Sequence, residues 1–401
     1  GGMQAATAVN KVITNNDNQG NILCFDMGGT TAKACLVENG KPMHANEFEV
    51  ARIFRGKKGS GIPLKIPVIE MIEIGAGGGS IAHLDNLGLI QVGPESASAD
   101  PGPACYGMGG LNATVTDADL ILGYLDANNF LGGDMQLDVE ASKTAVKNTI
   151  ADPLELSVVD AAWAIHETVN ESMAQAAAIH ALEKAKRITD FSMIPIGGAG
   201  PVHACNIALK LNLSTLICPP GAGVASALGF LVSPTSFTTL QGGVVSLSQL
   251  NFKTLKKQIL EMEEQGRNLI TEAMESKDDV YVEILASMRY IGQGYNVEVE
   301  IPKSVLSSQN ISEIQQLFEV VYLTQFGRIE SHMAIEIVSW RVVTSGPTPT
   351  IDLAKARVGV QSDNYKKGER QVYFGCKNDF ISTPIYERSK LEIGQKQNGA
   401  N

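Results

Sequence analysis

Phe25-Asp26-Met27-Gly28-Gly29-Thr30-Thr31 is the stretch that decides the fold. The apolar run Ile22–Phe25 predicts a short buried strand before it, and Ala32–Val37 predicts a second strand after it. Glycines at the turn let backbone N–H groups approach phosphate oxygens, and the threonine hydroxyls can add donors. Asp26 is placed to hold a magnesium ion, which prefers oxygen ligands. Short glycine motifs are weakly specific, so a glycine hairpin capped by an aspartate stays open as an alternative.

A second glycine loop, Gly197-Gly198-Ala199-Gly200-Pro201, lies between a predicted strand, Met193–Ile196, and a predicted helix, Val202–Leu211. This order places a helix N-terminus and backbone amides at Gly197, Gly198, Ala199 and Gly200, which suits an anion or the edge of a nucleotide. A tight strand-to-helix turn without a ligand is the alternative.

The rest of the chain predicts an α/β fold followed by an α+β module. We predict one domain over residues 1–240 and a second over residues 241–401, which ends without a closing element. Ser157 and Asp160 begin a long helix with an acidic form of the capping box. The other predicted elements are helices at Met3–Ile13, Ala225–Leu231 and Leu250–Met274, strands at Ile66–Ile74, Thr215–Cys218, Tyr281–Tyr290, Tyr295–Ile301 and Ile335–Val343, a hairpin turn at Glu38–Gly40 and a surface loop at Arg52–Gly61.

Composition narrows the class of protein. The 401 residues carry a formal charge of -11 with no basic run, which argues against nucleic acid and anionic membranes as partners. No apolar stretch reaches the length of a membrane span. The six cysteines are scattered without CxxC spacing, which favours reduced thiols in a cytoplasmic protein.

Several long strings carry a closer resemblance. They are FDMGGTTAKACLVENG (25–40), VIEMIEIGAGGGSIAHLD (68–85), VGPESASADPGPACYGMGG (92–110), TVTDADLILGYL (114–125), FLGGDMQLD (130–138), IPIGGAGPVHAC (194–205) and SALGFL (226–231). With these strings the chain resembles the A subunits of the hydantoinase/oxoprolinase family, strongly to about residue 235 and more loosely to SGP (345–347).

The resemblance implies a fold and an activity. The fold is the nucleotide-embracing half shared by actin, sugar kinases and heat-shock chaperones. The activity is ATP-dependent opening of a cyclic amide, with ATP and Mg²⁺ as cofactors and a B-type subunit as partner. Family A subunits carry an earlier DxGGT-type loop, and Gly1-Gly2 looks like the tail of a family GPAGG segment. We therefore expect this chain to hold half of the nucleotide site and to bind ATP poorly alone.

Individual residues follow from these loops. We predict Asp26, Thr30 and His203 to be nearest the chemistry, and Asp26 to hold the metal. His203, on the first turn of the helix after the second loop, could instead pack against that loop. Lys33 either neutralises phosphate charge or faces solvent.

The other titratable residues give weaker indications of a functional role. His180 is more typical of a core histidine than of a ligand, and His83 has no evident partner. His44, His166 and His332 lack metal-ligand spacing. Asp100, Asp117 and Asp119 are plausible polar contacts or loop caps, and Cys105 has no adjacent base in the sequence to make it a nucleophile.

The leading functional hypothesis is a subunit of an ATP-dependent cyclic-amide hydrolase. The ATP-using subunit of a ketone carboxylase is a close rival, which stimulation by a ketone plus bicarbonate would distinguish. A chaperone-like ATP-driven binding module is a more distant one, which predicts peptide-stimulated ATP hydrolysis. A sugar kinase is weaker still, because no catalytic aspartate stands in a sugar-binding loop.

Overall fold

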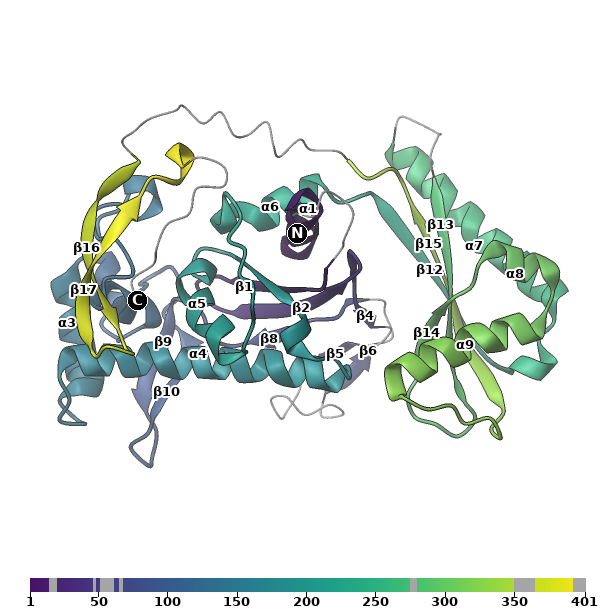
Figure 1. The fold of residues 1–401 in the computed structure, drawn as a ribbon, viewed down its shortest axis with the longest axis horizontal. Helices are drawn as coiled ribbons and strands as arrows, with labels where there is room; N and C mark the ends of the chain where they lie inside the picture. The colour runs from purple at the N-terminus through teal and green to yellow at the C-terminus, as the bar shows by residue number, and fades with distance from the viewer. Residues whose placement is uncertain are drawn as a thin grey trace. The chain divides into compact units, whose positions relative to one another are not determined.

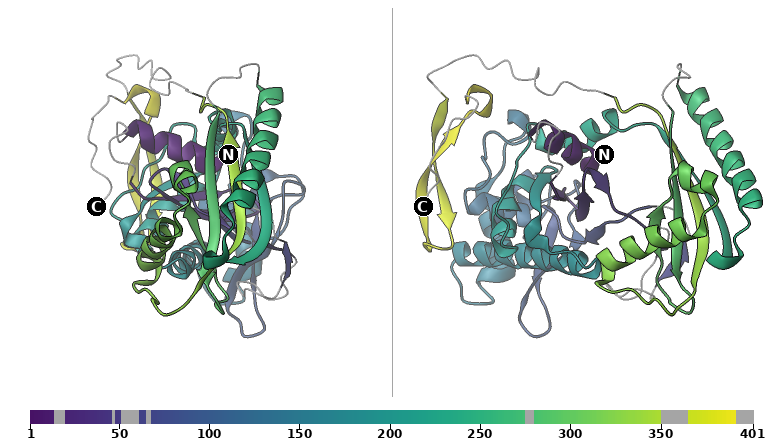
Figure 2. Two further views of the ribbon diagram at one scale, coloured as in Figure 1. Left: turned by 90° about the vertical axis from the view of Figure 1, so that its right-hand side faces the viewer. Right: turned by 45° about the vertical axis from the view of Figure 1, so that its right-hand side comes forward.

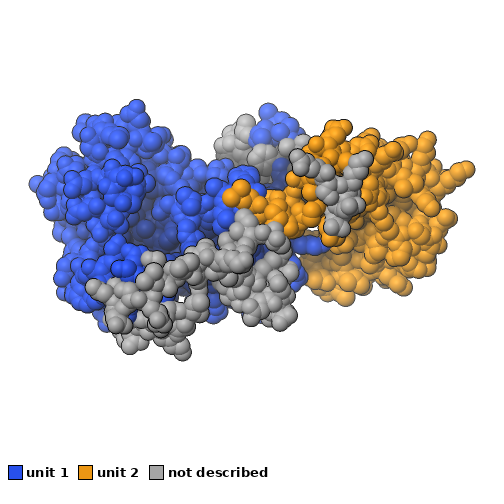
Figure 3. Space-filling view, turned by 90° about the horizontal axis from the view of Figure 1, so that it is seen from above, with its two compact units in different colours: residues 1–230, 351–401 blue, residues 231–350 orange. Residues whose placement is uncertain are grey.

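The computed structural model describes residues 1–13, 20–45, 48–50, 61–64, 68–274, 280–349 and 365–391. The loop predicted over Arg52–Gly61 lies outside these ranges, apart from its last residue. The chain forms two compact units, drawn in different colours in Figure 3: Gly1–Phe230 with Ile351–Asn401, and Leu231–Thr350. Among the described helices, none combines the length and the apolar character needed to cross a lipid bilayer.

The central sheet of unit 1 has the strand order β11-β1-β2-β3, with β8 beside β2. Its strands are β1 (Ile22–Met27), β2 (Ala32–Glu38), β3 (Lys41–Pro42), β8 (Ile72–Ile74) and β11 (Ser192–Ile196). Strand β1 runs antiparallel to β2 and parallel to β11. The opening strand, turn and second strand predicted from the sequence are thereby confirmed, and the first strand extends two residues further, through Asp26 and Met27.

Helices cover both faces of this sheet (Figure 1). Alternate residues of a strand point to opposite faces. Leu23, Phe25 and Met27 therefore pack in the core that includes α4 (Val158–Glu183) and α5 (Gly200–Lys210). Ile22 and Cys24 pack in a second core with α1 (Gly2–Ile13). Unit 1 is thus an α/β fold with helical layers on either side of β1.

Local sequence signals explain where the main helices of unit 1 begin. At α4, Ser157 is the N-cap and its side chain accepts a hydrogen bond from the Asp160 amide, as predicted. At α2 (Val115–Ile121), Thr114 and Asp117 form a capping box. The other helical segments of unit 1 are α3 (Val139–Val146), a π turn at Lys147–Ala151, α6 (Ala225–Leu231), and 3₁₀ turns at Ala104–Tyr106, Leu131–Gly133, Ile188–Asp190, Ala222–Val224 and Arg388–Lys390.

Short strand pairs complete unit 1. They are β4 (His44–Ala45) with β7 (Val68–Ile69), β5 (Phe48–Val50) with β6 (Ile62–Leu64), and β9 (Ser80–Leu84) with β10 (Ile90–Ser96). The strand predicted over Ile66–Ile74 is, within the described residues, two strands, β7 and β8, separated by Glu70 and Met71.

The strand predicted over Thr215–Cys218 does not form. The segment makes a single parallel bridge, between Leu216 and Met193. Two prolines follow directly, and proline has no N–H to extend a strand ladder. The carbonyl oxygens of Cys218 and Pro219 accept instead from the Arg388 guanidinium.

The last described hairpin, β16 (Lys366–Phe374) and β17 (Asp379–Tyr386), belongs to unit 1. The Tyr373 amide donates to Leu122 O at 2.9 Å, and the Tyr124 hydroxyl donates to Tyr373 O at 2.8 Å. The compact units divide the chain differently from the predicted domains over residues 1–240 and 241–401, which stay a prediction. The difference arises because these hydrogen bonds join segments about 250 residues apart.

Unit 2 is an antiparallel sheet, in the order β12-β15-β13-β14, covered by helices (Figure 2). Its elements are β12 (Ser236–Ser246), a 3₁₀ turn at Leu247–Gln249, α7 (Phe252–Ala273), β13 (Tyr281–Tyr290), β14 (Val297–Glu300), α8 (Lys303–Ser308), α9 (Ile311–Phe326) and β15 (Ile335–Ser345). Helix α7 crosses β15 closely at Gly266, where a Cβ atom would lie 2.2 Å from Thr344 Oγ1. The predicted α+β texture of this region is confirmed.

Candidate nucleotide site

The two predicted glycine loops lie side by side. Strands β1 and β11 are parallel neighbours, with Asp26 paired to Ile196, so both loops leave the same edge of the sheet. The Ala199 amide donates to Met27 O at 3.1 Å, which ties the second loop to the end of β1. The sequence placed each loop after a strand, and the parallel pairing brings Gly28–Thr31 and Gly197–Gly200 together.

Gly197 is the glycine whose conformation and surroundings admit no side chain. Its φ is +83°, and a Cβ atom there would lie 2.3 Å from Met27 O. Gly28, Gly29 and Gly198 are different, because a Cβ on any of them would meet nothing within 4 Å. The space beside these three glycines is therefore open on the side where a ligand would approach.

A third glycine segment, residues 75–79, is hydrogen-bonded to the first loop. The amide of Gly78 donates to Gly28 O at 3.0 Å, and the amide of Gly79 donates to Gly29 O at 2.6 Å. A Cβ on Gly77 would lie 2.7 Å from Gly29 O, so the two backbones touch. The unusual GAGGG string at 75–79 thus has a structural role, which is to fix the carbonyl oxygens of the first loop.

The Asp26 carboxylate is half-buried and held from a distant part of the chain. Its Oδ2 accepts a hydrogen bond of 2.8 Å from the Ser226 hydroxyl, at the start of α6. The segment before Ser226 also contacts the second loop, because the Gly197 amide donates to Ala222 O at 2.9 Å. Residues 222–226 are therefore a further wall of the candidate site. The string SALGFL marked Ser226 as part of the family pattern without indicating this contact.

Lys33 has features of both alternatives that the sequence left open, a lysine that faces solvent and a positive charge near the phosphates. Its side chain is 43% exposed and lies 3.3 Å from Glu73, as expected for a surface lysine. Its Nζ also donates to Thr31 Oγ1 at 2.9 Å, so the charge stands directly beside the first loop.

His203 is not at the face of the loop. It is fully buried, because residues 200, 203, 204, 207 and 208 form the inward stripe of α5. Its Nδ1 lies 2.8 Å from Asn170 Oδ1, and its Nε2 lies 3.1 Å from Asp119 Oδ2. In this structure the buried His203 side chain joins α5 to α4 and α2 through Asn170 and Asp119.

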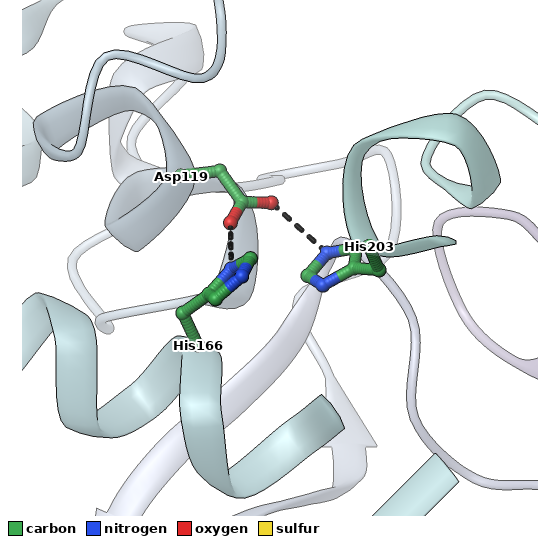
Figure 4. A group of neighbouring side chains, drawn as sticks. All are labelled: Asp119, His166 and His203. Atoms are coloured by element: carbon green, nitrogen blue, oxygen red, sulfur yellow. Dashed lines mark hydrogen bonds and ion pairs between the residues drawn. The ribbon is translucent and has the colours of Figure 1, made fainter. Parts of the chain in front are cut away.

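His203 belongs to a buried polar cluster that the sequence did not reveal (Figure 4). His166 Nδ1 lies 2.7 Å from Asp119 Oδ1, and the rings of His166 and His203 stack with centroids 4.7 Å apart. Burial alone raises the pKa of Asp119, but the two imidazoles, His203 above all, more than offset it and lower the pKa to about 2. Burial lowers the pKa of His166. The available signal was the buried stripe of α4, on which His166 lies with Ile165 and Val169.

Asp117 and Cys105 are structural. The fully buried Asp117 carboxylate accepts from the amides of Ala104, Cys105 and Thr114 and from the hydroxyls of Thr114 and Ser142. This confirms its interpretation as a loop cap. Burial and the Asp117 charge raise the pKa of the Cys105 thiol far above its usual value, so Cys105 is not an activated nucleophile. His180 is also buried, as expected for a core residue.

Comparison with known families agrees with this arrangement. The hydantoinase/oxoprolinase family model matches residues 2–238, and the model of the hydantoinase/oxoprolinase C-terminal domain matches residues 247–401. The chain belongs to the hydantoinase/oxoprolinase family. The resemblance carried by the glycine-rich strings is thereby confirmed.

Individual relatives cover nearly all of the chain. Caprolactamase subunit alpha of Pseudomonas jessenii is 30% identical over 94% of this chain and 53% of the relative. Acetone carboxylase beta subunit of Xanthobacter autotrophicus is 28% identical over 94% of this chain and 53% of the relative. The structure of ATP-dependent caprolactamase from Pseudomonas jessenii superposes with a TM-score of 0.74 at 28% identity, covering 96% of this chain and 55% of that one. The chain thus spans about half the length of these relatives, and the predicted α/β fold with a C-terminal module is confirmed.

Proposed function

We propose that this chain supplies one side of the ATP site in an ATP-dependent cyclic-amide hydrolase. The observation that carries the proposal is the adjacency of the two glycine loops at the shared edge of β1 and β11, with Asp26 held between them by Ser226. The relative named as an ATP-dependent caprolactamase supports the choice of a cyclic amide as substrate. Because the chain spans about half of such relatives, we propose that residues outside the match supply the other side.

The residues of the first loop have the chemistry to hold a magnesium nucleotide. A carboxylate and three hydroxyls, from Asp26, Thr30, Thr31 and Ser226, are hard oxygen donors of the kind that magnesium prefers. In this proposal Asp26 holds the ion, and the backbone amides of Gly29, Thr30 and Thr31 donate to phosphate oxygens, whereas the Gly28 amide closes the loop by donating to Thr31 O at 3.1 Å. Lys33, beside Thr31, adds a positive charge at the rim.

In this proposal the second loop binds the other part of the nucleotide. Gly197, Gly198 and Ala199 precede α5, which begins at Gly200 and whose N-terminal amides and dipole favour negative charge or polar edges. Open space beside Gly198 lets the ligand approach the backbone. Pro201 near the start of α5 costs no hydrogen bond, because the first amides of a helix lack partners within the helix.

ATP would supply a phosphoryl group to the amide oxygen, which would make the carbonyl carbon more open to attack by water. The ring nitrogen would then leave as the C–N bond breaks, and hydrolysis of the resulting acyl phosphate would release phosphate and the open-chain amino acid. The contribution of this chain is to position the phosphates and neutralise their charge, the two effects that dominate phosphoryl transfer. The related alpha and beta subunits support a B-type partner that completes hydrolysis. The scattered spacing of the six cysteines is typical of reduced thiols and supports a cytoplasmic location.

A ketone carboxylase is the second candidate, supported by the 28% identity to an acetone carboxylase subunit. The two are separated by measuring ATP hydrolysis by the complete enzyme with a cyclic amide, and with a ketone plus bicarbonate. The proposal predicts stimulation by the amide alone. Stimulation only by the ketone with bicarbonate would reverse the choice, and stimulation by neither would reject both.

A further inference from the structure

Three buried side chains from three helices of unit 1 converge on one point. Asp119 lies on α2, His166 on α4 and His203 on α5, and one ligand atom of each lies within 4.8 Å of the others. Their side chains are 3%, 0% and 0% exposed. None of the three is needed to contact the nucleotide in the proposed function, so the cluster requires its own explanation.

The hydrogen bonds fix the state of the two rings. His166 Nε2 lies 3.0 Å from the Asn206 amide nitrogen, which can only donate, so the hydrogen of His166 is on Nδ1, toward Asp119. His203 Nδ1 lies 2.8 Å from the Asn170 carbonyl oxygen, which can only accept, so Nδ1 carries a hydrogen there. The outer nitrogens of both imidazoles are thereby satisfied.

His203 Nε2 is the ring nitrogen of this pair of histidines that has no hydrogen-bond partner. It is buried and makes no hydrogen bond, although Asp119 Oδ2 is only 3.1 Å away. The contact is short enough for a hydrogen bond, but its direction does not suit one. Nε2 and Asp119 Oδ2 therefore lie within ion-pair distance of each other without a well-directed hydrogen bond. The Asp119 carboxylate also brings a negative charge into the protein interior, and a cation beside it offsets the cost of burying that charge.

A metal cation resolves both problems. Metal-ligating histidines donate their other ring N–H to a carbonyl or carboxylate, as His203 already does to Asn170. Two imidazoles and one carboxylate suit zinc and its first-row neighbours better than magnesium or calcium, which prefer oxygen. Zinc binds nitrogen and oxygen at about 2.0–2.2 Å, so small side-chain rotations would seat it among the three ligand atoms.

We propose that Asp119, His166 and His203 bind one divalent first-row transition metal ion, zinc in the first instance, as a structural site. On binding, the hydrogen of His166 moves from Nδ1 to Nε2, which then donates to the carbonyl oxygen of Asn206 after its amide turns. No net proton is gained or lost by the ring. The ion ties together α2, α4 and α5, and α5 follows the second glycine loop directly.

The test is the metal content and thermal stability of the purified full chain, before and after chelation and after reloading with zinc. We expect one zinc per chain, and a midpoint raised by about 2–4 °C for each kcal/mol of binding free energy. Asp119→Asn and His203→Gln keep the size of the side chain and should lose the ion and the rise in midpoint. His180→Gln, which changes another buried histidine of α4, is the matched control and should keep both.

Spectroscopy of the wild-type chain covers the case in which a variant fails to fold. Cobalt loaded in place of zinc should give visible absorption bands that zinc displaces. A chain that takes up no zinc, manganese or cobalt in stoichiometric amount, with an unchanged midpoint, would overturn the proposal and leave a hydrogen-bonded cluster without an ion. Equal metal binding by Asp119→Asn and the wild type would overturn it too.

Discussion

The Asp26 carboxylate accepts a 2.8 Å hydrogen bond from the Ser226 hydroxyl across 200 residues of sequence. This bond joins the end of β1 to the start of α6. It holds the one carboxylate of the first loop in a fixed orientation before any ligand arrives. Pre-oriented charge needs no reorganisation when phosphate and magnesium bind, and this is how such sites gain affinity.

Removing the hydroxyl tests this relationship. Ser226→Ala should weaken magnesium–ATP binding by the complete enzyme about 2- to 12-fold, the value of one hydrogen bond. Fluorescence or calorimetric titration measures it. Ser172→Ala is the control, because the Ser172 hydroxyl bonds only to the backbone of its own helix. Equal losses in both variants would show that the Asp26 contact has no special role.

The two glycines at the start of the second loop should respond differently to the same change. Gly197→Ala should cost about 1–3 kcal/mol of unfolding free energy, since the residue has a φ of +83° and its Cβ would press on Met27 O. Gly198→Ala adds a methyl group to open space and should leave the unfolding midpoint nearly unchanged. Denaturant unfolding of the two variants measures the contrast. Similar midpoints would contradict the described backbone of the loop.

Thiol labelling should separate the cysteines by their surroundings. Cys205 and Cys376 are exposed, whereas Cys105 is buried beside Asp117, and both burial and that charge raise its pKa. In the folded chain at mild alkaline pH, mass spectrometry should find iodoacetamide on Cys205 and Cys376 first, with Cys105 unmodified until the chain unfolds. Early modification of Cys105 would restore it as a candidate nucleophile.

Unit 2 should become less stable in acid because Glu263 becomes protonated. Burial alone raises the pKa of Glu263, but Lys303 and Arg267 outweigh it and lower the pKa below the ordinary value of 4.5. A lowered folded-state pKa means that the contribution is complete above about 4.5 and is lost as pH falls through the folded-state value. The stability difference between wild type and Glu263→Gln should therefore shrink below that pH.

Thermal unfolding from neutral pH to well below pH 4 measures this difference. Glu261→Gln is the control, because Glu261 is 58% exposed and pairs only loosely with Lys257, at 3.8 Å. A difference between wild type and Glu263→Gln that stays constant with pH would refute the role of the ion pairs.

Local signals in the sequence predicted much of the fold. Glycine spacing marked both loops, and Ser157 with Asp160 marked the start of α4 at the observed residue. These features depend on residues that are close in the sequence. The two loops form one site because β1 and β11 pair in parallel. The alternation of strands and helices in the sequence indicated the class of fold but not this pairing.

The buried features that were missed depend on contacts between distant residues. His166 and Asp119 are 47 residues apart, and neither has a local pattern that points to the other. The position of His203 next to a glycine loop suggested a ligand contact, whereas the inward stripe of α5 determines where its side chain lies. The β16–β17 hairpin packs on unit 1 through Tyr124 and Tyr373, 249 residues apart, so composition could not assign it.

The most direct test of the central claim is ATP hydrolysis by the complete enzyme with and without a cyclic amide, for wild type and Asp26→Asn. We expect the amide to stimulate the wild type. We expect Asp26→Asn, with an unchanged circular dichroism spectrum, to lose about 100-fold or more in kcat/KM, because the carboxylate that holds magnesium is gone. An Asp26→Asn enzyme that keeps the amide-stimulated rate of the wild type would contradict the account.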